Sequence, residues 1–177
     1  MAVRKALAYS KRYARPYTRV SRAKGKSYIK VVPHNKVVKF TMGNPQAYNE
    51  GKFPFVLHLN SKESAQVRDL AIEAARQVLT KTLDAQLLNL YYLEVKVHPH
   101  HILRNNKAAA GAGADRMSTG MSRAFGDVEG RAAKVPAGKD IFVIHCADEN
   151  GAKKVRVALT MAKSKLPCAT GILFEKR

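Results

Sequence analysis

The clearest signal in the sequence is an alternation of hydrophobic and polar positions over several short stretches. In "YYLEVKVHPH" the hydrophobic residues recur at every second position, namely Tyr91, Leu93, Val95 and Val97. This is the period of a β-strand with one buried face. The stretch "FPFVLHLN" has the same period, and Pro54 suggests that it starts at a sheet edge. Further strands are predicted in "KVVKFTMG", "GRAAKV", "KDIFVIHCA" and "CATGILFEK".

Two longer stretches have helical spacing instead. "NSKESAQVRDLAIEAARQVLTKTLDAQLL" predicts a helix capped by Asn60 or Ser61, with Glu63 near its positive end. Its expected inward face is Val67, Leu70, Ala71, Ala74, Val78 and Leu79. "DENGAKKVRVALTMAKSKLP" predicts a second helix, capped by Asp148 or Asn150. Its expected inward face is Val155, Ala158, Leu159, Ala162 and Leu166.

This order of elements predicts an α+β fold, with two helices packed on a mixed or antiparallel sheet. Residues 36–177 would form a single globular domain, whereas residues 1–35 lack periodicity and would form an extended arm. The segment "NPQAYNEGK" is expected to be a connector, and residues 105–126 a long internal loop. Two cysteines, Cys146 and Cys168, stand in apolar surroundings typical of buried thiols rather than of a disulfide.

Charge points to a polyanionic partner. The 177 residues include 32 Lys and Arg against 13 Asp and Glu, a formal charge of +19. Residues 1–49 contain no acidic residue, and tyrosines are interspersed among the cations of the arm, which suits phosphate contacts and base stacking. The arm residues expected to bind RNA are Arg12, Arg15, Arg19, Arg22, Lys24 and Lys26.

A membrane role is not supported by the pattern. The arm is broken by Pro16, Gly25 and Pro33 and offers no continuous apolar face. No run approaches the roughly 20 apolar residues of a membrane span, and the basic N-terminus does not resemble a signal peptide. We therefore expect a cytoplasmic protein.

Three motifs suggest chemistry, but each has a simpler interpretation. In "HPHH" (residues 98–101), His98 and His100 would share one face of an extended segment and could hold zinc, yet neither Cys146 nor Cys168 stands at a spacing suitable for the third and fourth ligands. The histidines of this motif, His101 included, are more simply partly exposed RNA contacts at a strand end, and Arg104 is a further expected RNA contact. In "HC", adjacent side chains of a strand point to opposite faces, so His145 cannot activate Cys146. "GAGAD" lacks the strand and helix context of a phosphate loop.

The segment "NNKAAAGAGADRMSTGMSRAFG", residues 105–126, is the most unusual part of the sequence. It holds four of the eleven glycines and exceeds the length of about 12 to 15 residues beyond which a structureless loop is usually functional or a linker. Met117, Met121 and Phe125 are spaced for one face of a short helix, and Arg116 and Arg123 could reach phosphates. The alternative is a surface excursion without a function.

These residues resemble a known family. "HHILRNNKAAAGAGADRMSTGMSRAFG", "GRAAKVPAGKDIFVIHC" and "AKSKLPCATG" are similar to the archaeal and eukaryotic branch of a universal large-subunit ribosomal protein, the L-ten-e family, counterpart of bacterial L-sixteen. The similarity runs from about Pro33 to Phe174. It implies an α/β hammerhead-type sandwich with no enzymatic activity and no cofactor. The longer, more basic "MAVRKALAYSKRY" departs from the family, so contacts of that part are not transferred.

The resemblance also implies partners. Members bind large-subunit ribosomal RNA between the central protuberance and the peptidyl-transferase centre, beside the path of tRNA in the aminoacyl and peptidyl sites. The loop matching residues 105–126 projects toward the catalytic RNA and is commonly mobile off the ribosome. The loop residues expected nearest RNA are Lys107, Arg116, Ser118, Met121 and Arg123. Neighbouring ribosomal proteins are further expected partners, and homo-oligomers are not expected.

Two other functions fit parts of the sequence. A general nucleic-acid packaging protein is favoured by charge alone and would be indifferent to RNA identity. An RNA-modifying enzyme would use His98, His100 or Cys146, but the sequence scatters its titratable groups. A structural protein of an archaeal large ribosomal subunit accounts for both the charge and the loop.

Overall fold

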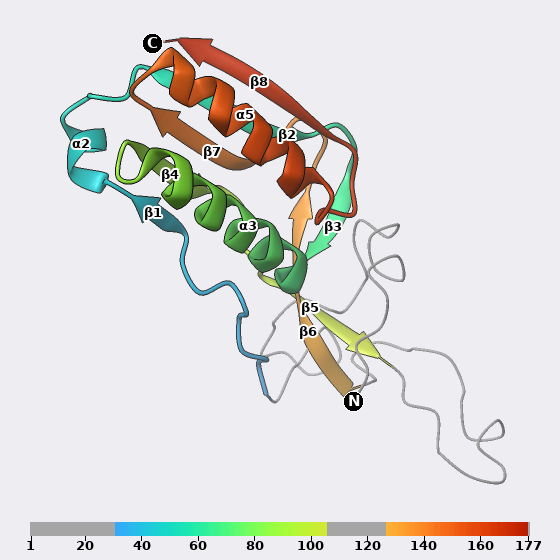
Figure 1. Cartoon of the computed structure of the whole chain (residues 1–177). Helices are drawn as coiled ribbons and strands as arrows, with labels where there is room; N and C mark the ends of the chain where they lie inside the picture. The colour runs from blue at the N-terminus through green and yellow to red at the C-terminus, as the bar shows by residue number, and fades with distance from the viewer. Residues whose placement is uncertain (1–30, 106–126, 177) are drawn as a thin grey trace, which may run out of the picture.

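The main body is a five-stranded antiparallel sheet with two helices on one face (Figure 1). The computed structural model describes residues 31–105 and 127–176. The strand order is β1 (Thr41–Gly43), β4 (Tyr91–Val95), β7 (Asp140–Cys146), β2 (Phe55–Ser61) and β8 (Thr170–Lys176). Helices α3 (Asp69–Leu87) and α5 (Glu149–Lys163) lie side by side across it. The predicted α+β fold is confirmed, and all strand pairs in the described residues are antiparallel.

The core lies between this sheet and the two helices. Strand register brings Leu57 and Leu93 to either side of Ile144, and all three side chains are buried under the helices. The predicted inward face of α5 is confirmed for Val155, Ala158, Leu159 and Ala162; Leu166 is also buried but follows the end of the helix at Lys163. Helix α5 follows Asp148 as N-cap. Local amphipathic spacing therefore sufficed to orient this helix.

A second, three-stranded sheet extends from the body beyond the N-terminal end of α3 (Figure 1). It consists of β3 (Ala65–Arg68), β6 (Asp127–Val135) and β5 (His101–Asn105), with β6 in the middle. The buried Ala133 and Val135 tie β6 to the main core. One end of the three-stranded sheet is therefore packed into the same hydrophobic core as the main sheet.

The structure corrects the prediction for the first helix. It begins at Asp69, not after Asn60 or Ser61, because residues 65–68 form β3 and pair with β6. Its buried apolar face is Ile72, Ala75, Leu79, Leu83 and Leu87. Of the predicted inward residues only Leu79 is buried on this helix, while Val67 is buried in β3 and Leu70 is 41% exposed. Instead of assisting a cap, Glu63 accepts a hydrogen bond from the backbone N–H of Ala169.

Smaller corrections concern the first strands. The strand expected from residue 36 is only β1, and the expected connector contains a short helix, α2 (Pro45–Asn49), capped by Asn44. Strand β2 is an interior strand with Pro54 just outside it, so the edge prediction was wrong. Gly43 adopts φ +92°, and a Cβ there would lie 2.3 Å from the Tyr91 carbonyl oxygen. Glycine is thus required where β1 turns toward α2.

Candidate nucleic-acid interface

Residues 36–38, which follow the basic arm, are hydrogen-bonded to the first turns of α3. The backbone N–H of Lys36 donates to Asp69 Oδ2 at 3.2 Å, and that of Val38 donates to Glu73 Oε2 at 3.3 Å. Alternate residues of an extended chain are about 6.6 Å apart, and four residues along a helix rise about 6 Å. The spacing of the two carboxylates along α3 therefore matches the spacing of the two N–H groups along the extended chain. Between them, the side chain of Val37 is buried in the core.

Each carboxylate is held by further bonds. Glu73 accepts from Arg76 at two oxygens, with Nε–Oε2 at 2.8 Å and an NH2–Oε1 distance of 2.5 Å. These bonds are the main reason that the pKa of Glu73 is lowered. Burial raises the pKa of Asp69, and the N–H groups of Lys36 and Leu70 oppose that rise. Such bidentate, partly desolvated pairs are geometrically specific, so segment 36–38 has one defined path along α3.

The start of the described chain is also tied to the three-stranded sheet. Arg131 on β6 donates from Nε to the Pro33 carbonyl oxygen at 2.7 Å. Further along, the Phe40 carbonyl accepts from the N–H of Val95 at 2.8 Å. Residues 33–40 thus pass from β6 along α3 to the edge of the main sheet. The described end of the arm, residues 31–35, therefore contacts β6 through Pro33.

The long loop starts and ends at the same sheet. In the β5–β6 ladder His101 pairs with Ala132, Leu103 with Gly130, and Asn105 with Asp127. Asn105 and Asp127 are the described residues that flank 106–126. Pro33, near the start of the described chain, and the strand ends at Asn105 and Asp127 therefore all belong to or contact the three-stranded sheet (Figure 1).

The histidines of "HPHH" differ in environment. His98 and His100 are exposed, and the His98 ring stacks on Phe40 with centroids 5.3 Å apart. Partial burial, then the charges of Arg131 and His100, lower the pKa of His98. His101 was expected to be partly exposed, but it lies in β5 and is buried because its strand pairs with β6. No group of three or more metal-ligating side chains occurs in residues 31–105 and 127–176.

The "HC" pair is divided between the two faces of the main sheet, as adjacent strand residues must be. Cys146 faces the helices, and its thiol donates to the Phe55 carbonyl at 3.8 Å. Burial, then Asp148, raises the pKa of Cys146 to about 11. The thiol therefore stays protonated at neutral pH and is not an activated nucleophile. His145 packs on the other face near Tyr48 and Tyr92, which stack at 4.2 Å. Both cysteines are free and buried, as predicted.

The remaining predicted RNA-binding residues divide into two groups. Arg104 lies in β5 and is 2% exposed, so its guanidinium is enclosed by protein. The other predicted residues fall outside the described part of the chain: Arg12, Arg15, Arg19, Arg22, Lys24, Lys26, Lys107, Arg116, Ser118, Met121 and Arg123. Their RNA contacts stay predictions.

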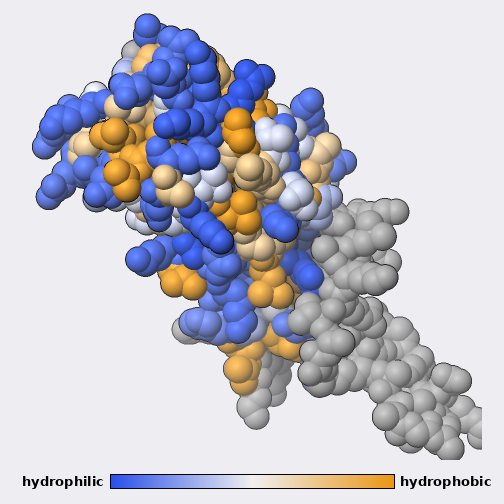
Figure 2. All heavy atoms as spheres, viewed as in Figure 1, coloured by the Kyte–Doolittle hydropathy of each residue, from blue (hydrophilic) through white to orange (hydrophobic). Residues whose placement is uncertain are grey.

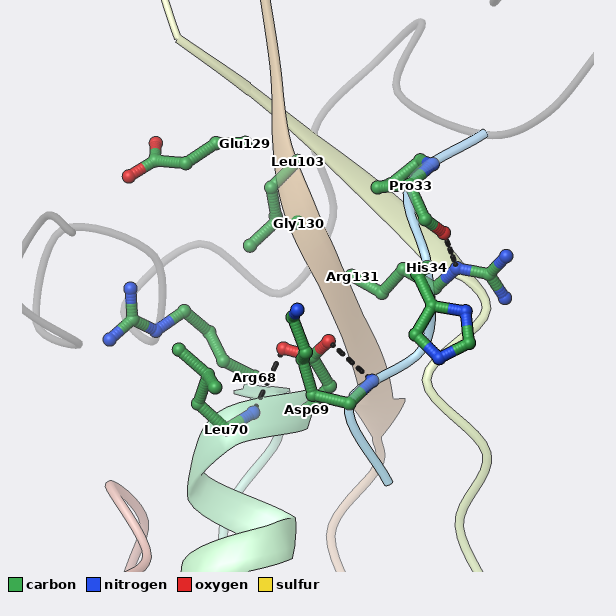
Figure 3. A pocket seen from close by; sticks show the side chains of 10 residues that line it. Pro33, His34, Arg68, Asp69, Leu70, Leu103, Glu129, Gly130 and Arg131 are labelled. Atoms are coloured by element: carbon green, nitrogen blue, oxygen red, sulfur yellow. Dashed lines mark hydrogen bonds between the residues drawn. The ribbon is translucent and has the colours of Figure 1, made fainter. Parts of the chain in front are cut away.

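Sequence reasoning missed a pocket at the junction of these elements (Figure 3). It has a volume of about 260 Å³ and lies between segment 33–36, the start of α3, and strands β5 and β6. Lys36, Arg68 and Arg131 bring three cations to it. The helix predicted over 60–88 hid this site, because Arg68 was assigned to a helix surface rather than to the end of β3.

A basic groove lies beside the C-terminal half of α5. It is about 560 Å³ in volume and is lined by Lys62, Arg156 and Lys163, with no carboxylate among its lining residues in the described chain. The visible face of the body is largely hydrophilic, with apolar side chains only in separate patches (Figure 2). In the described part of the chain, no helix has the length and apolar character needed to cross a membrane.

Residues 14–173 match the family model described as Ribosomal protein L16p/L10e. The chain is 40% identical over 178 residues to the large ribosomal subunit protein uL16 of Pyrobaculum neutrophilum, covering 100% of this chain and 94% of that protein. Its counterpart in Archaeoglobus fulgidus is 41% identical over 167 residues, covering 94% and 90%.

A third relative, the large ribosomal subunit protein uL16 of Methanococcus maripaludis, is 41% identical over 179 residues and covers 99% of this chain and 96% of that protein. The similarity thus extends over the arm, the body and the long loop alike, so the expectation that the first thirteen residues are longer than in the family and depart from it was wrong. The chain belongs to the ribosomal protein L16p/L10e family.

Proposed function

We propose that this protein is a non-enzymatic constituent of the large ribosomal subunit in the cytoplasm. It binds large-subunit ribosomal RNA near the peptidyl-transferase centre and assists tRNA placement. The relatives are named large ribosomal subunit proteins, and the family resemblance of residues 105–126 supports the location. Neighbouring ribosomal proteins complete its surroundings.

One observation carries the proposal: the arm and the long loop join the body at the same three-stranded sheet. Ten of the 32 Lys and Arg residues lie in residues 1–30. Joining both segments to one sheet concentrates contacts with closely packed phosphates, while the rigid body fixes where the segments begin. Recognition of this kind depends on RNA shape and backbone rather than on base identity.

Salt dependence of binding to large-subunit RNA tests the mechanism. Six to ten phosphate contacts would weaken affinity by about 10³ to 10⁵ between 50 and 200 mM salt. The salt slope is the slope of the logarithm of the binding constant against the logarithm of the salt concentration. Replacing Arg12, Arg15 and Arg19 by Gln should make this slope shallower by about two to three. A variant with Gln at Lys81, Lys153 and Lys154 loses the same charge on α3 and α5 and should keep most of the slope. Affinity that is independent of salt would contradict the proposal.

The loop is tested separately by deletion of residues 108–117. Because the pairing of β5 with β6 involves residues 101–105 and 127–132, outside the deleted positions, the variant should fold and enter the subunit. Binding of tRNA to the reconstituted subunit should then decrease. Unfolding of the variant would show that the segment belongs to the core instead.

The two rival functions predict different results. A packaging protein would bind small-subunit and large-subunit RNA equally, so competition between the two RNAs separates it from our proposal. An RNA-modifying enzyme acting through Cys146 requires a thiolate, which the raised pKa disfavours. Loss of an RNA modification in Cys146→Ala, with RNA binding intact, would support the enzyme.

A further inference from the structure

The pocket at the base of the three-stranded sheet has an open, apolar interior. Its wall includes Leu103, which is 1% exposed, and Leu70, which is 41% exposed. Gly130 lines it as well, and a Cβ added there would meet no atom within 4 Å. A strand interior normally favours a side chain over glycine. The space above Gly130 is therefore vacant, and the residues around it do not use it for packing.

The size of the pocket suits a planar ring. A protein cavity of roughly 150 Å³ accommodates benzene, and this pocket measures about 260 Å³. A nucleobase could enter with its faces against Leu70 and the Gly130 backbone. Absence of a side chain at Gly130 allows a close approach of that kind.

The charges around the pocket favour a base over a phosphate in its interior. Lys36, Arg68 and Arg131 line it together with two carboxylates, Asp69 and Glu129 (Figure 3). A bare phosphate inside would be attracted by the cations and repelled by the carboxylates. A neutral base is not repelled, and its own phosphate can remain outside. Lys36, which is exposed, is the cation positioned for that phosphate.

We propose that this pocket receives one unpaired base of the large-subunit RNA, with Lys36 at the adjoining phosphate. This inference rests on the proposed function, because it specifies one contact within the same RNA interface. Bases that leave a helix are commonly recognised by stacking in protein pockets. The contact would anchor the RNA between the points where the arm and the long loop join the body.

Two substitutions at Gly130 test the pocket without changing charge. Gly130→Leu fills it, whereas Gly130→Ala places only a Cβ in space that is open. Gly130→Leu should weaken binding to large-subunit RNA by about fivefold, the lower limit for a base stacked on an aromatic ring, because Leu70 and the backbone contact the base here. Gly130→Ala should remain within about twofold. Thermal unfolding, followed by circular dichroism, checks that both variants are folded.

Salt dependence and chemical probing identify what occupies the pocket. Gly130→Leu should leave the salt slope unchanged, while Lys36→Gln should reduce it by about one. Probing with dimethyl sulfate for adenine and cytosine, and with a carbodiimide for uracil and guanine, should reveal one base that is modified with Gly130→Leu and protected by wild type and by Gly130→Ala. A reduced slope in Gly130→Leu would mean a phosphate in the pocket and would overturn the proposal.

The remaining outcomes separate this proposal from the function beneath it. If Gly130→Leu binds the RNA as tightly as wild type does, and the same bases are protected from modification in both complexes, the base-binding pocket alone is overturned. Wild type that fails to distinguish large-subunit RNA overturns the proposed function and the pocket with it. If a folded Gly130→Ala is as defective as Gly130→Leu, the pocket volume is not what matters and the proposal is wrong.

Discussion

Replacing Glu73 by Ala should be among the most damaging single changes on α3. Glu73 holds Arg76 through two hydrogen bonds and also accepts from the backbone of Val38. The Glu73 and Arg76 side chains are each 11% exposed. Removing one partner of a buried ion pair costs about 3–5 kcal/mol, because the other charge stays desolvated. The lost Val38 bond adds to this.

We expect a value near the lower limit, about 3 kcal/mol, because Arg76 keeps a contact with Met42 Sδ at 3.2 Å. For a chain of this length that corresponds to a decrease in Tm of roughly 6–12 °C. Urea unfolding followed by circular dichroism measures it. The control is Glu149→Ala, whose pair with Lys153 is 3.9 Å long and about three-quarters exposed. That variant should lose less than about 1 kcal/mol.

The pH dependence gives a second check on the same pair. The pKa of Glu73 is lower in the folded protein than the ordinary value of about 4.3. Its contribution is therefore present above that value and is lost as pH falls through the folded pKa. The difference in stability between wild type and Glu73→Ala should be constant near pH 7 and shrink in acid. Equal losses in Glu73→Ala and Glu149→Ala, or a difference that is unchanged at pH 3, would refute the reasoning.

Two further predictions concern Gly43 and Cys146. Gly43→Ala should cost at least about 2 kcal/mol, since φ is +92° and the Cβ would clash with the Tyr91 carbonyl. Gly51 also has a positive φ, +74°, but a Cβ there would meet open space. Gly51→Ala should therefore lower the free energy of unfolding in urea clearly less than Gly43→Ala does; equal losses would contradict the clash. Iodoacetamide should modify Cys146 slowly in the native protein at pH 8 and rapidly in urea, because the thiol is buried with a raised pKa. Fast native labelling would contradict this.

The sequence predicted those elements whose periodicity is strong and whose packing is local. Helix α5 and strands β4, β7 and β8 were found because each has one continuous apolar face or a fully apolar run. The family resemblance was confirmed by the match over residues 14–173. The charge of the arm and the length of the loop indicated that the arm and residues 105–126 bind RNA.

The start of α3 could not be predicted in this way. Residues 65–68 satisfy helical spacing on their own, and they become a strand only because β6, more than 60 residues later, pairs with them. The five residues of β5 carry little alternation and were also missed; they are a strand for the same reason. Backbone hydrogen bonds to a distant partner outweigh a weak local preference.

The candidate site shows the same division. The sequence by itself determined how much positive charge the protein carries, that the arm carries much of it, and that the arm lacks a continuous apolar face. Only the tertiary structure decided that Arg131 holds Pro33, that Asp69 and Glu73 hold residues 36–38, and that a pocket opens above Gly130. These contacts join residues 33 to almost 100 positions apart. Composition and periodicity record local preferences, whereas such contacts depend on how the sheets and helices pack together.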